Sequence, residues 1–250
     1  MNIFIFGATG GTGRALVDQA LQQGHLVTAF ARDPAKIHTT HANLRIAKGN
    51  ILDYDSVKAA LQDQDAALSA LGVRPPVAIL IIVAIACQLL ARLAGLHGVL
   101  NWVVRLGLPL LAILVAQRRT TTLSDGTRNI VRAMEELGVR RFVCESSLGI
   151  GDSRGQWGFL YRYILIPLLL RNVFADKEVQ EKVIRDSKLQ WVIVRPAALT
   201  NGPRTSAYRS WTGLPTAPIR RRISRADVAD FMLKQLAEDT YLSKTPAVSY

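Results

Sequence analysis

Short apolar runs alternate with stretches of helical periodicity along most of the chain. Residues 2–6, Asn-Ile-Phe-Ile-Phe, predict a buried parallel strand. Residues 14–23 then place apolar side chains at helical spacing, and Gly24 ends that pattern. The same alternation predicts strands at 25–30, 44–47, 66–70, 141–144 and 190–194, and helices at 55–61, 124–137 and 175–187. It therefore predicts an α/β protein: a Rossmann-type, doubly wound parallel sheet with helices on both faces.

One apolar segment interrupts this alternation. After the strand that ends near Leu71, residues 77–116 are almost wholly apolar, and Arg92 and Arg105 are their only charges. A structureless loop of that length is uncommon inside a compact domain. We therefore expect an inserted hydrophobic helical hairpin at 77–117 within a single NAD(P)-binding domain that spans residues 1–250.

The composition of the insert suggests a membrane. A bilayer core of ~30 Å asks for about 20 apolar residues per helix. The run at 77–91 is shorter than that and Arg105 lies inside the second run, so the hairpin would cross with snorkelling arginines or enter one leaflet. Flanking arginines at 74, 118 and 119 place the domain on the cytoplasmic or stromal-equivalent face. The alternative is a buried helical pair that extends the core or forms a dimer interface.

Residues 157–170 are a second apolar segment. They carry aromatic residues, one arginine and then aliphatic residues, as in a helix that lies in the headgroup layer. The segment could equally cover the active site. The expected partners are therefore membrane lipid or a membrane protein complex.

A glycine-rich motif, Gly7-Ala8-Thr9-Gly10-Gly11-Thr12-Gly13, follows the first strand and opens the first helix. In such a motif Gly7 permits the tight turn, Gly10 lets the backbone approach a pyrophosphate, and Gly13 allows close helix–sheet packing. The helix N-terminus then offers free N–H groups and a positive dipole end to the phosphates. The motif predicts a dinucleotide cofactor.

The end of the second strand indicates which dinucleotide is bound. NAD sites place an acidic residue there for the ribose 2′-hydroxyl, whereas NADP sites place an arginine beside the 2′-phosphate. Here Arg32 occupies that region, and Arg14 follows the third glycine. We expect NADP(H). In the alternative, Asp33 binds the ribose of NAD(H) and Arg32 points to water.

The chain is basic, with 31 Lys and Arg against 19 Asp and Glu and a formal charge of +12. No aromatic residues are interleaved with the arginine clusters, so nucleic acid is not expected. A phosphorylated cofactor and an anionic membrane account for the charge, as does a merely basic solvated surface. The two cysteines fit a reducing compartment, His38 and His41 lack a third ligand for a metal, and the strand that begins at Asn2 leaves no room for a targeting peptide.

Several motifs together resemble the atypical short-chain dehydrogenase/reductases, and most closely their NmrA-like and biliverdin-IXβ/flavin reductase-like branch. They are the glycine motif and the runs 49–53, 70–72, 125–131 and 194–196. The resemblance implies that adenine lies beside Asn50 and Ile51. It also implies that the nicotinamide half passes Leu71, Gly72, Ser146 and the loop Pro196-Ala197-Ala198.

Ordinary members of that family reduce carbonyls with a Tyr-x-x-x-Lys pair and a serine. Lys177 matches the lysine, but Val173 stands where the tyrosine would be. Ser146 and Ser147 would line the nicotinamide pocket, or else cap a helix or turn, and Lys177 could be an ordinary exposed lysine. The candidate catalytic residues are Ser146, Ser147 and Lys177.

The missing tyrosine makes alcohol–ketone chemistry unexpected. An acceptor that collects its proton from solvent, such as a quinone, flavin or bilin, remains compatible. The chain is thus expected to be a membrane-associated NADPH-dependent reductase of a conjugated acceptor, or a non-catalytic NADP(H)-binding subunit or assembly factor of a membrane complex. The candidate cofactor-binding residues are Gly7, Thr9, Gly10, Gly11, Thr12, Gly13, Arg14, Arg32, Asn50, Ile51, Leu71, Gly72, Ser146, Lys177, Pro196, Ala197 and Ala198.

Overall fold

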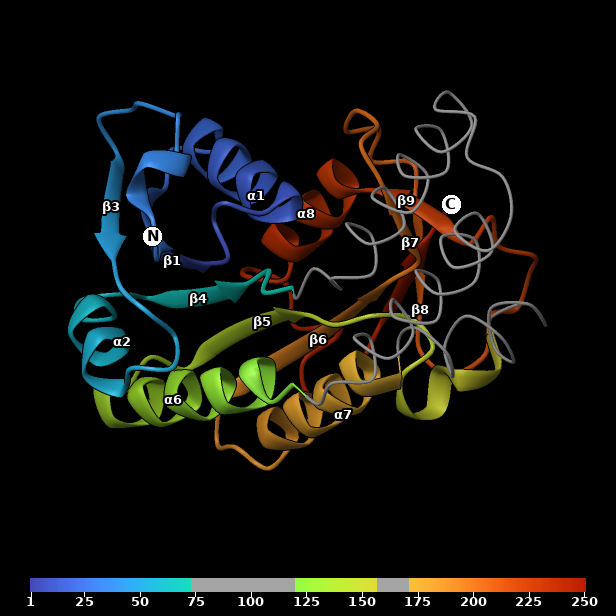
Figure 1. Ribbon diagram of the computed structural model, residues 1–250. Coiled ribbons are helices and arrows are strands. Elements are labelled where there is room, and N and C mark those ends of the chain that lie inside the picture. The colour runs from blue at the N-terminus through green and yellow to red at the C-terminus, as the bar shows by residue number, and fades with distance from the viewer. Residues whose placement is uncertain (73–119, 157–170) are drawn as a thin grey trace, which may run out of the picture. The chain divides into compact units, whose positions relative to one another are not determined.

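An eight-stranded sheet forms the centre of the computed structural model, which describes residues 1–72, 120–156 and 171–250 (Figure 1). The sheet order is β3-β2-β1-β4-β5-β6-β10-β8, and every neighbouring pair is parallel except β10 and β8. Its strands are β1 (Asn2–Phe6), β2 (Leu26–Ala31), β3 (Leu44–Lys48), β4 (Ala66–Ser69), β5 (Arg141–Glu145), β6 (Gln190–Pro196), β8 (Arg209–Trp211) and β10 (Ala247–Ser249). A separate parallel pair joins β7 (Ala198–Thr200) to β9 (Arg222–Ser224).

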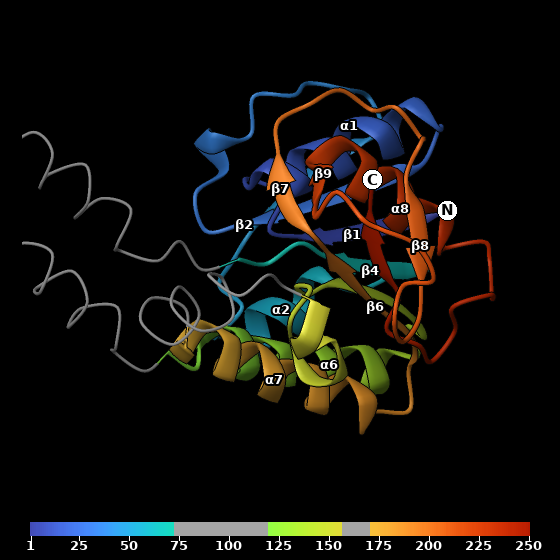
Figure 2. The ribbon, with the colours of Figure 1, turned by 90° about the vertical axis from the view of Figure 1, so that its right-hand side faces the viewer.

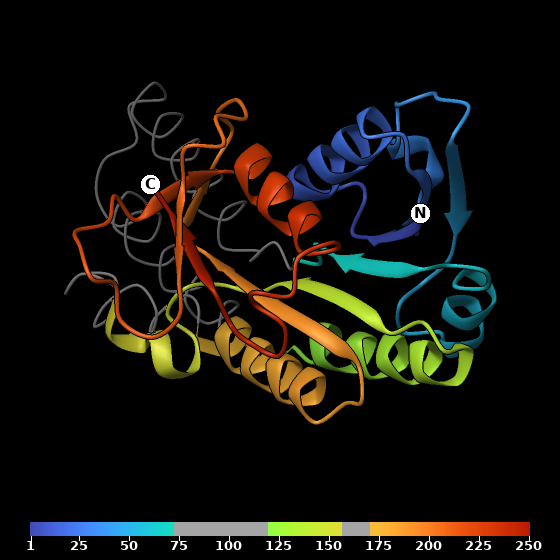
Figure 3. The ribbon, with the colours of Figure 1, turned by 180° about the vertical axis from the view of Figure 1, so that it is seen from behind.

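Helices cover both faces of the sheet. The first helix, α1 (Gly11–Gln22), packs beside α8 (Arg225–Lys234) on one face, as Figure 3 shows from behind. On the other face lie α2 (Tyr54–Ala60), α6 (Thr122–Leu137) and α7 (Arg171–Arg185), which Figure 2 shows below the strands. Two 3-10 helices, η1 (Pro34–Lys36) and η3 (Gly151–Gln156), follow β2 and β5. This is the doubly wound arrangement that the alternation of apolar patterns predicts.

The central strands are buried because their side chains are apolar on both faces. Phe4, Phe6 and Phe30 form an aromatic group in the core, and the ring centroids of Phe4 and Phe6 are 4.7 Å apart. The registers Phe6↔Phe30 and Phe6↔Ser69 bring β1, β2 and β4 to an end at one edge. The glycine-rich turn therefore begins where three parallel strands end, which is the edge where open α/β sheets bind ligands.

The α/β class and the mostly parallel sheet are confirmed. The sequence pattern predicted no element after the strand at 190–194, whereas β7, β8, β9, α8 and β10 follow β6. Four of these elements are three-residue strands, too short to show a period. The expected hairpin at 77–117 and the segment 157–170 lie outside the described residues. No helix in the described parts of the chain is both long and apolar enough to cross a bilayer.

Candidate functional site

The glycine-rich turn is closely packed against the end of β4. Gly7 has φ of +75°, and a Cβ atom there would lie 2.5 Å from the Ala70 carbonyl oxygen. The Gly10 N–H donates to the Gly7 carbonyl at 2.9 Å, and this bond closes the turn. A Cβ atom at Gly13 would overlap the Gly7 carbonyl group, so the first turn of α1 packs directly on the loop. The contacts at Gly7 and Gly13 require glycine, as the sequence predicts for a phosphate-binding turn.

The N-terminus of α1 carries no side-chain cap. Gly10 is its N-cap residue and makes no side-chain hydrogen bond to the first turn. The first N–H groups of a helix without such a cap are available to an anion. Arg225, the first residue of α8, crosses this end of α1: a Cβ atom at Gly11 would lie 2.8 Å from its Nε. The Arg225 guanidinium donates to Asn201 Oδ1 at 2.5 Å.

Exposed arginines follow the glycine-rich turn and β2. Arg32 follows β2 and is exposed, and Arg14 is exposed in the first turn of α1. Asp33 accepts a hydrogen bond from the Ala35 N–H at 3.3 Å and pairs with Lys36 at 3.1 Å. The hydrogen bond from Lys36 lowers the pKa of the Asp33 carboxyl. The acidic group is thus already engaged as the cap of η1, while Arg32 lies free of any ion pair among the described residues.

The loop at Asn50 and Ile51 is held by α6. The Asn129 side-chain amide donates to the Ile51 carbonyl at 2.9 Å, and Gly126 leaves room for the Ile51 side chain, since a Cβ there would lie 2.6 Å from Ile51 Cδ1. The exposed Asn50 side chain accepts a hydrogen bond from the Leu52 N–H at 3.2 Å. This loop follows β3 at the same edge of the sheet as the glycine-rich turn. Its place fits the adenine-side role that the family resemblance implies.

Lys177 is buried rather than exposed. Its side chain is 9% accessible, and its Nζ donates to the backbone carbonyl of Glu145, at the end of β5, at 3.4 Å. That burial excludes an ordinary solvated helix lysine. Val173 lies one helical turn earlier on α7, at the position where the family resemblance would place the tyrosine.

Glu145 ends β5 and is 7% accessible. Its carboxylate accepts a hydrogen bond from Thr12 Oγ1 at 3.2 Å, and Thr12 is itself buried in the first turn of α1. Burial raises the pKa of the Glu145 carboxyl, and the nearby charge of Lys177, the Thr12 hydrogen bond and Arg225 offset only part of that rise. Glu145 directly precedes Ser146 and Ser147 at the end of a predicted buried strand. The sequence therefore contained a signal for this residue, but the prediction did not include it among the site residues.

Ser146 belongs to a buried polar network. Its hydroxyl donates to Glu181 Oε1 at 2.6 Å, and Arg195 forms two hydrogen bonds to the same carboxylate at 3.0 and 2.7 Å. Arg185 and Asp152 complete the network at either end. Burial alone would raise the pKa of Glu181, but the Arg195 hydrogen bonds more than reverse this and hold it low. The Ser146 hydroxyl is therefore bonded to the Glu181–Arg195 pair. The Ser146 N–H donates to the Val194 carbonyl at 2.7 Å, and this backbone bond joins the ends of β5 and β6.

The remaining predicted residues lie at the same strand ends. Ser147 is half-buried and donates to the Leu148 carbonyl at 3.2 Å. Leu71 is half-buried and Gly72 exposed just after β4. Pro196 and Ala197 are buried at the end of β6, and Ala198 is exposed at the start of β7. The topology thus brings the predicted nicotinamide-side residues to the carboxyl ends of β4, β5 and β6.

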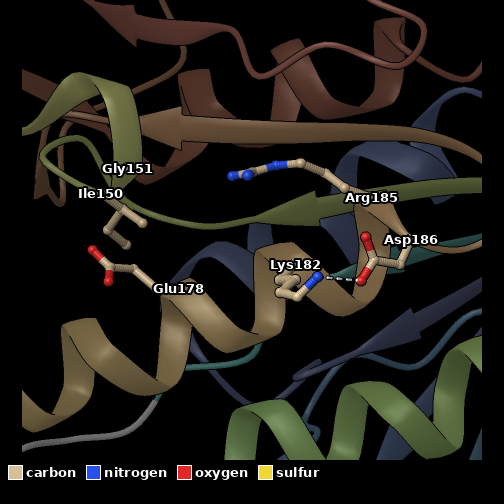
Figure 4. Close-up of a pocket in the computed structure, with 6 residues that line it drawn as sticks. All are labelled: Ile150, Gly151, Glu178, Lys182, Arg185 and Asp186. Atoms are coloured by element: carbon tan, nitrogen blue, oxygen red, sulfur yellow. Dashed lines mark hydrogen bonds and ion pairs between the residues drawn. The ribbon is translucent and has the colours of Figure 1, made fainter.

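A separate hollow of about 510 Å³ lies beside α7. Figure 4 shows its lining, Ile150, Gly151, Glu178, Lys182, Arg185 and Asp186. Its two cations are already paired, Lys182 with Asp186 at 2.8 Å and Arg185 with Glu181. None of the predicted cofactor-binding residues lines it, so it is separate from the predicted dinucleotide site.

Relatives of the chain include proteins of several kinds. An uncharacterized chloroplastic protein of Arabidopsis thaliana is 29% identical over 81% of the chain and 61% of its own length. The photosystem II assembly factor Ycf39 of Synechocystis is 22% identical over 98% of the chain and 61% of its own length. The chain thus spans about three fifths of the length of these two relatives. The reductase pytE of Aspergillus terreus is 27% identical over 99% of the chain and 97% of its own length.

Solved structures share the fold. The anaerobilin reductase ChuY of Escherichia coli superposes with a TM-score of 0.68 at 19% identity, covering 100% of this chain and 97% of that one. A short-chain dehydrogenase/reductase of Veillonella parvula in complex with NADP gives a TM-score of 0.68 at 16% identity, covering 100% and 94%. The NAD(P)H-binding family model matches residues 7–104 and 110–239. With its glycine-rich turn at the carboxyl edge of the sheet, the chain belongs to the NAD(P)H-binding family and has the fold of the atypical short-chain dehydrogenase/reductases.

Proposed function

We propose that the chain is an NADPH-dependent reductase of a flat conjugated acceptor such as a quinone, flavin or bilin. The observation that carries the proposal is the meeting of the glycine-rich turn and the buried Lys177 at one edge of the sheet. When bound, NADPH supplies a hydride from the nicotinamide ring. The turn and the N-terminus of α1 would bind the diphosphate, and Lys177 would hold the nicotinamide ribose.

Binding of NADP(H) rather than NAD(H) is favoured by the charges at the end of β2. Asp33, the group that would select the ribose of NAD(H), is engaged by Lys36 and by the Ala35 N–H. Arg32 and Arg14 present exposed guanidinium groups that suit a bidentate contact with a 2′-phosphate. The NADP complex of the related Veillonella fold supports the same choice.

The proposed acceptor class is supported by the residue one helical turn before Lys177. A valine at residue 173 cannot donate a proton, so a carbonyl that needs a positioned acid in the transition state is disfavoured. A conjugated acceptor delocalises the charge that it gains and can take its proton from water. The similarity to pytE, named a reductase, and to ChuY, named an anaerobilin reductase, supports this class.

The test is NADPH oxidation by the full chain with a panel of quinones, flavins and bilins. We expect turnover with at least one of them, and slower turnover with weaker NADPH binding in Lys177→Met. Lys182→Met is the matched control, because Lys182 lies on the same helix but is exposed and paired with Asp186. NADPH binding without turnover on every acceptor would reject the reductase.

A second candidate function is a non-catalytic NADP(H)-binding subunit or assembly factor. Val173 in place of the tyrosine favours it, as does the similarity to Ycf39, a photosystem II assembly factor. Recovery of the chain in a complex of fixed stoichiometry, with NADPH bound and no turnover, would favour this function over the reductase.

Membrane association is part of the proposal and rests on the composition of residues 77–117. The segment would attach the domain to lipid or to a membrane complex, with the dinucleotide site on the cytoplasmic or stromal-equivalent face. Deletion of 77–117 should move the protein from the membrane fraction to the soluble fraction in cell fractionation. Unchanged membrane association of the deletion variant would reject the role of the segment.

A further inference from the structure

Two buried glutamates near the end of β5 have very different surroundings. Glu181 accepts hydrogen bonds from Ser146, Arg195 and Arg185. Glu145 receives, among the contacts of the described residues, one side-chain hydrogen bond, from Thr12. A buried carboxylate is stable only when several donors replace its hydration. Glu181 meets that condition and Glu145 does not.

The charges that face Glu145 come from α7 and α8. Lys177 is the stronger of the two influences, but its Nζ is hydrogen-bonded to the backbone carbonyl of Glu145 rather than to the carboxylate. Arg225 acts more weakly and bonds to Asn201. The third neighbour, Thr12 on α1, is uncharged. Burial outweighs these contributions, so the pKa of the Glu145 carboxyl lies above its ordinary range.

The position of Thr12 connects this carboxyl to the proposed phosphate site. Thr12 lies between Gly11 and Gly13 in the first turn of α1, so its N–H and hydroxyl belong to the helix end that would receive the diphosphate. A hydroxyl can donate only one hydrogen bond at a time. While Thr12 donates to an ionised Glu145, its proton is not available to a phosphate, and the two anions also repel each other.

We propose that Glu145 is a positioning residue for the phosphates of the dinucleotide, which acts through Thr12 and carries a proton when the dinucleotide is bound. The protonated carboxyl donates to Thr12 Oγ1, and the Thr12 hydroxyl then donates to a phosphate oxygen. The only bond that changes is the O–H bond of the Glu145 carboxyl: it forms with one proton from solvent on binding, and that proton returns to solvent on release. The inference rests on the proposed dinucleotide site and adds a proton linkage to it.

The negative charge of the phosphate decides whether NADPH binding strengthens or weakens with pH. Bound phosphate stabilises the protonated acid, so binding is strongest at low pH. Above the pKa of Glu145 in the free protein, the NADPH dissociation constant should rise by up to about tenfold per pH unit, until the pH passes the pKa in the bound state. The slope corresponds to uptake of at most one proton per nucleotide.

The experiment is an NADPH titration of the wild-type chain and of Glu145→Gln by calorimetry from pH 5.5 to 9, in buffers of different ionisation heat. The glutamine amide imitates the protonated acid, because it can donate to Thr12 without titrating. We expect NADPH binding to the wild type to weaken tenfold or more as the pH rises and to be accompanied by proton uptake. The pH dependence of NADPH binding should be smaller in Glu145→Gln. The 2′-phosphate, whose second pKa is about 6, titrates in both proteins and cancels in the comparison.

Thr12 supplies the second pair of variants. Thr12→Ser keeps the hydroxyl and should keep the pH dependence of NADPH binding. Thr12→Val should weaken NADPH binding and remove the part of the pH dependence that is due to Glu145. Identical pH profiles for wild type and Glu145→Gln would overturn the inference, as would an unchanged profile in Thr12→Val. Loss of binding at every pH in a folded Glu145→Gln would overturn it too. A wild-type chain that binds no NADPH at any pH would instead reject the proposed function, and the inference with it.

Discussion

Substitution of Gly13 by alanine tests the packing on which the dinucleotide site depends. The added Cβ atom would overlap the Gly7 carbonyl group, 2.7 Å from its carbon, and would lie 2.9 Å from Ala8 Cα. These neighbours are backbone atoms in a turn closed by the Gly10 N–H bond to Gly7. They cannot rotate away as a side chain would. The start of α1 must therefore withdraw from the turn by about 1 Å to restore ordinary carbon contacts.

Three contributions determine the change in the free energy of unfolding of Gly13→Ala. Overpacking of this kind costs about 1–3 kcal/mol, and loss of the turn hydrogen bond adds roughly 0.5–1.5 kcal/mol. The better helix propensity of alanine returns about 1 kcal/mol. Gly13→Ala should thus lower the free energy of unfolding by about 0.5–3.5 kcal/mol, which corresponds to roughly 1–14 °C in melting temperature for a domain of this size.

Gly13→Ala should reduce NADPH affinity more than it reduces folding stability. A displacement of about 1 Å exceeds the tolerance of the hydrogen bonds by which the α1 N–H groups would hold a phosphate. We expect NADPH affinity to fall by about tenfold or more in a fluorescence titration. Gly202→Ala is the control, since its Cβ atom would meet Ser224 Cβ at an ordinary 3.5 Å. If Gly13→Ala is destabilised yet binds NADPH within twofold of the wild type, the phosphates are not held at this turn.

Three further predictions follow from the charges. Arg32→Ala should weaken NADPH binding about tenfold or more and leave NADH unchanged, because only NADPH carries the 2′-phosphate; Arg45→Ala removes the same charge from exposed β3 and should change neither affinity. Arg195→Met should lower the free energy of unfolding by about 3–5 kcal/mol in urea denaturation, since it leaves Glu181 buried without its main partner, and Arg195→Met with Glu181→Leu should recover much of that loss. The melting temperature of Glu145→Gln should rise relative to that of the wild type as pH rises. The raised pKa of Glu145 stabilises the wild-type fold at low pH, and this stability is lost as the pH passes the pKa of Glu145 in the folded protein. A constant difference in melting temperature from pH 5 to 8 would contradict this.

The fold could be predicted from the sequence as far as its elements were long or strongly apolar. The apolar strand at Asn2–Phe6 and the periodic α6 helix were recognised with nearly correct bounds. The elements after β6 were not, because strands such as Ala247–Ser249 are defined by pairing with β6 and β8 rather than by a local pattern. The start of α8 did carry a signal, Ser224 with Asp227 three residues later, and the Ser224 hydroxyl indeed accepts from the Asp227 N–H.

The candidate site could be predicted in part. Glycines and strand ends are local features, so the turn and the edge of the sheet were identified from the sequence. The approach of Arg225 to Gly11 and the pairing of Glu181 with Arg195 join segments far apart in the chain, and no spacing in the sequence indicates them. Glu145 is the intermediate case: its place before Ser146 was visible, but its contact with Thr12 required the fold.

Titration of the wild-type chain with NADPH and with NADH measures the cofactor preference on which the proposed function depends. We expect one nucleotide per chain, with NADPH bound at least about tenfold tighter than NADH, because Arg14 and Arg32 would contact the 2′-phosphate while Asp33 is engaged. Tighter binding of NADH, or no binding of either nucleotide, would contradict it.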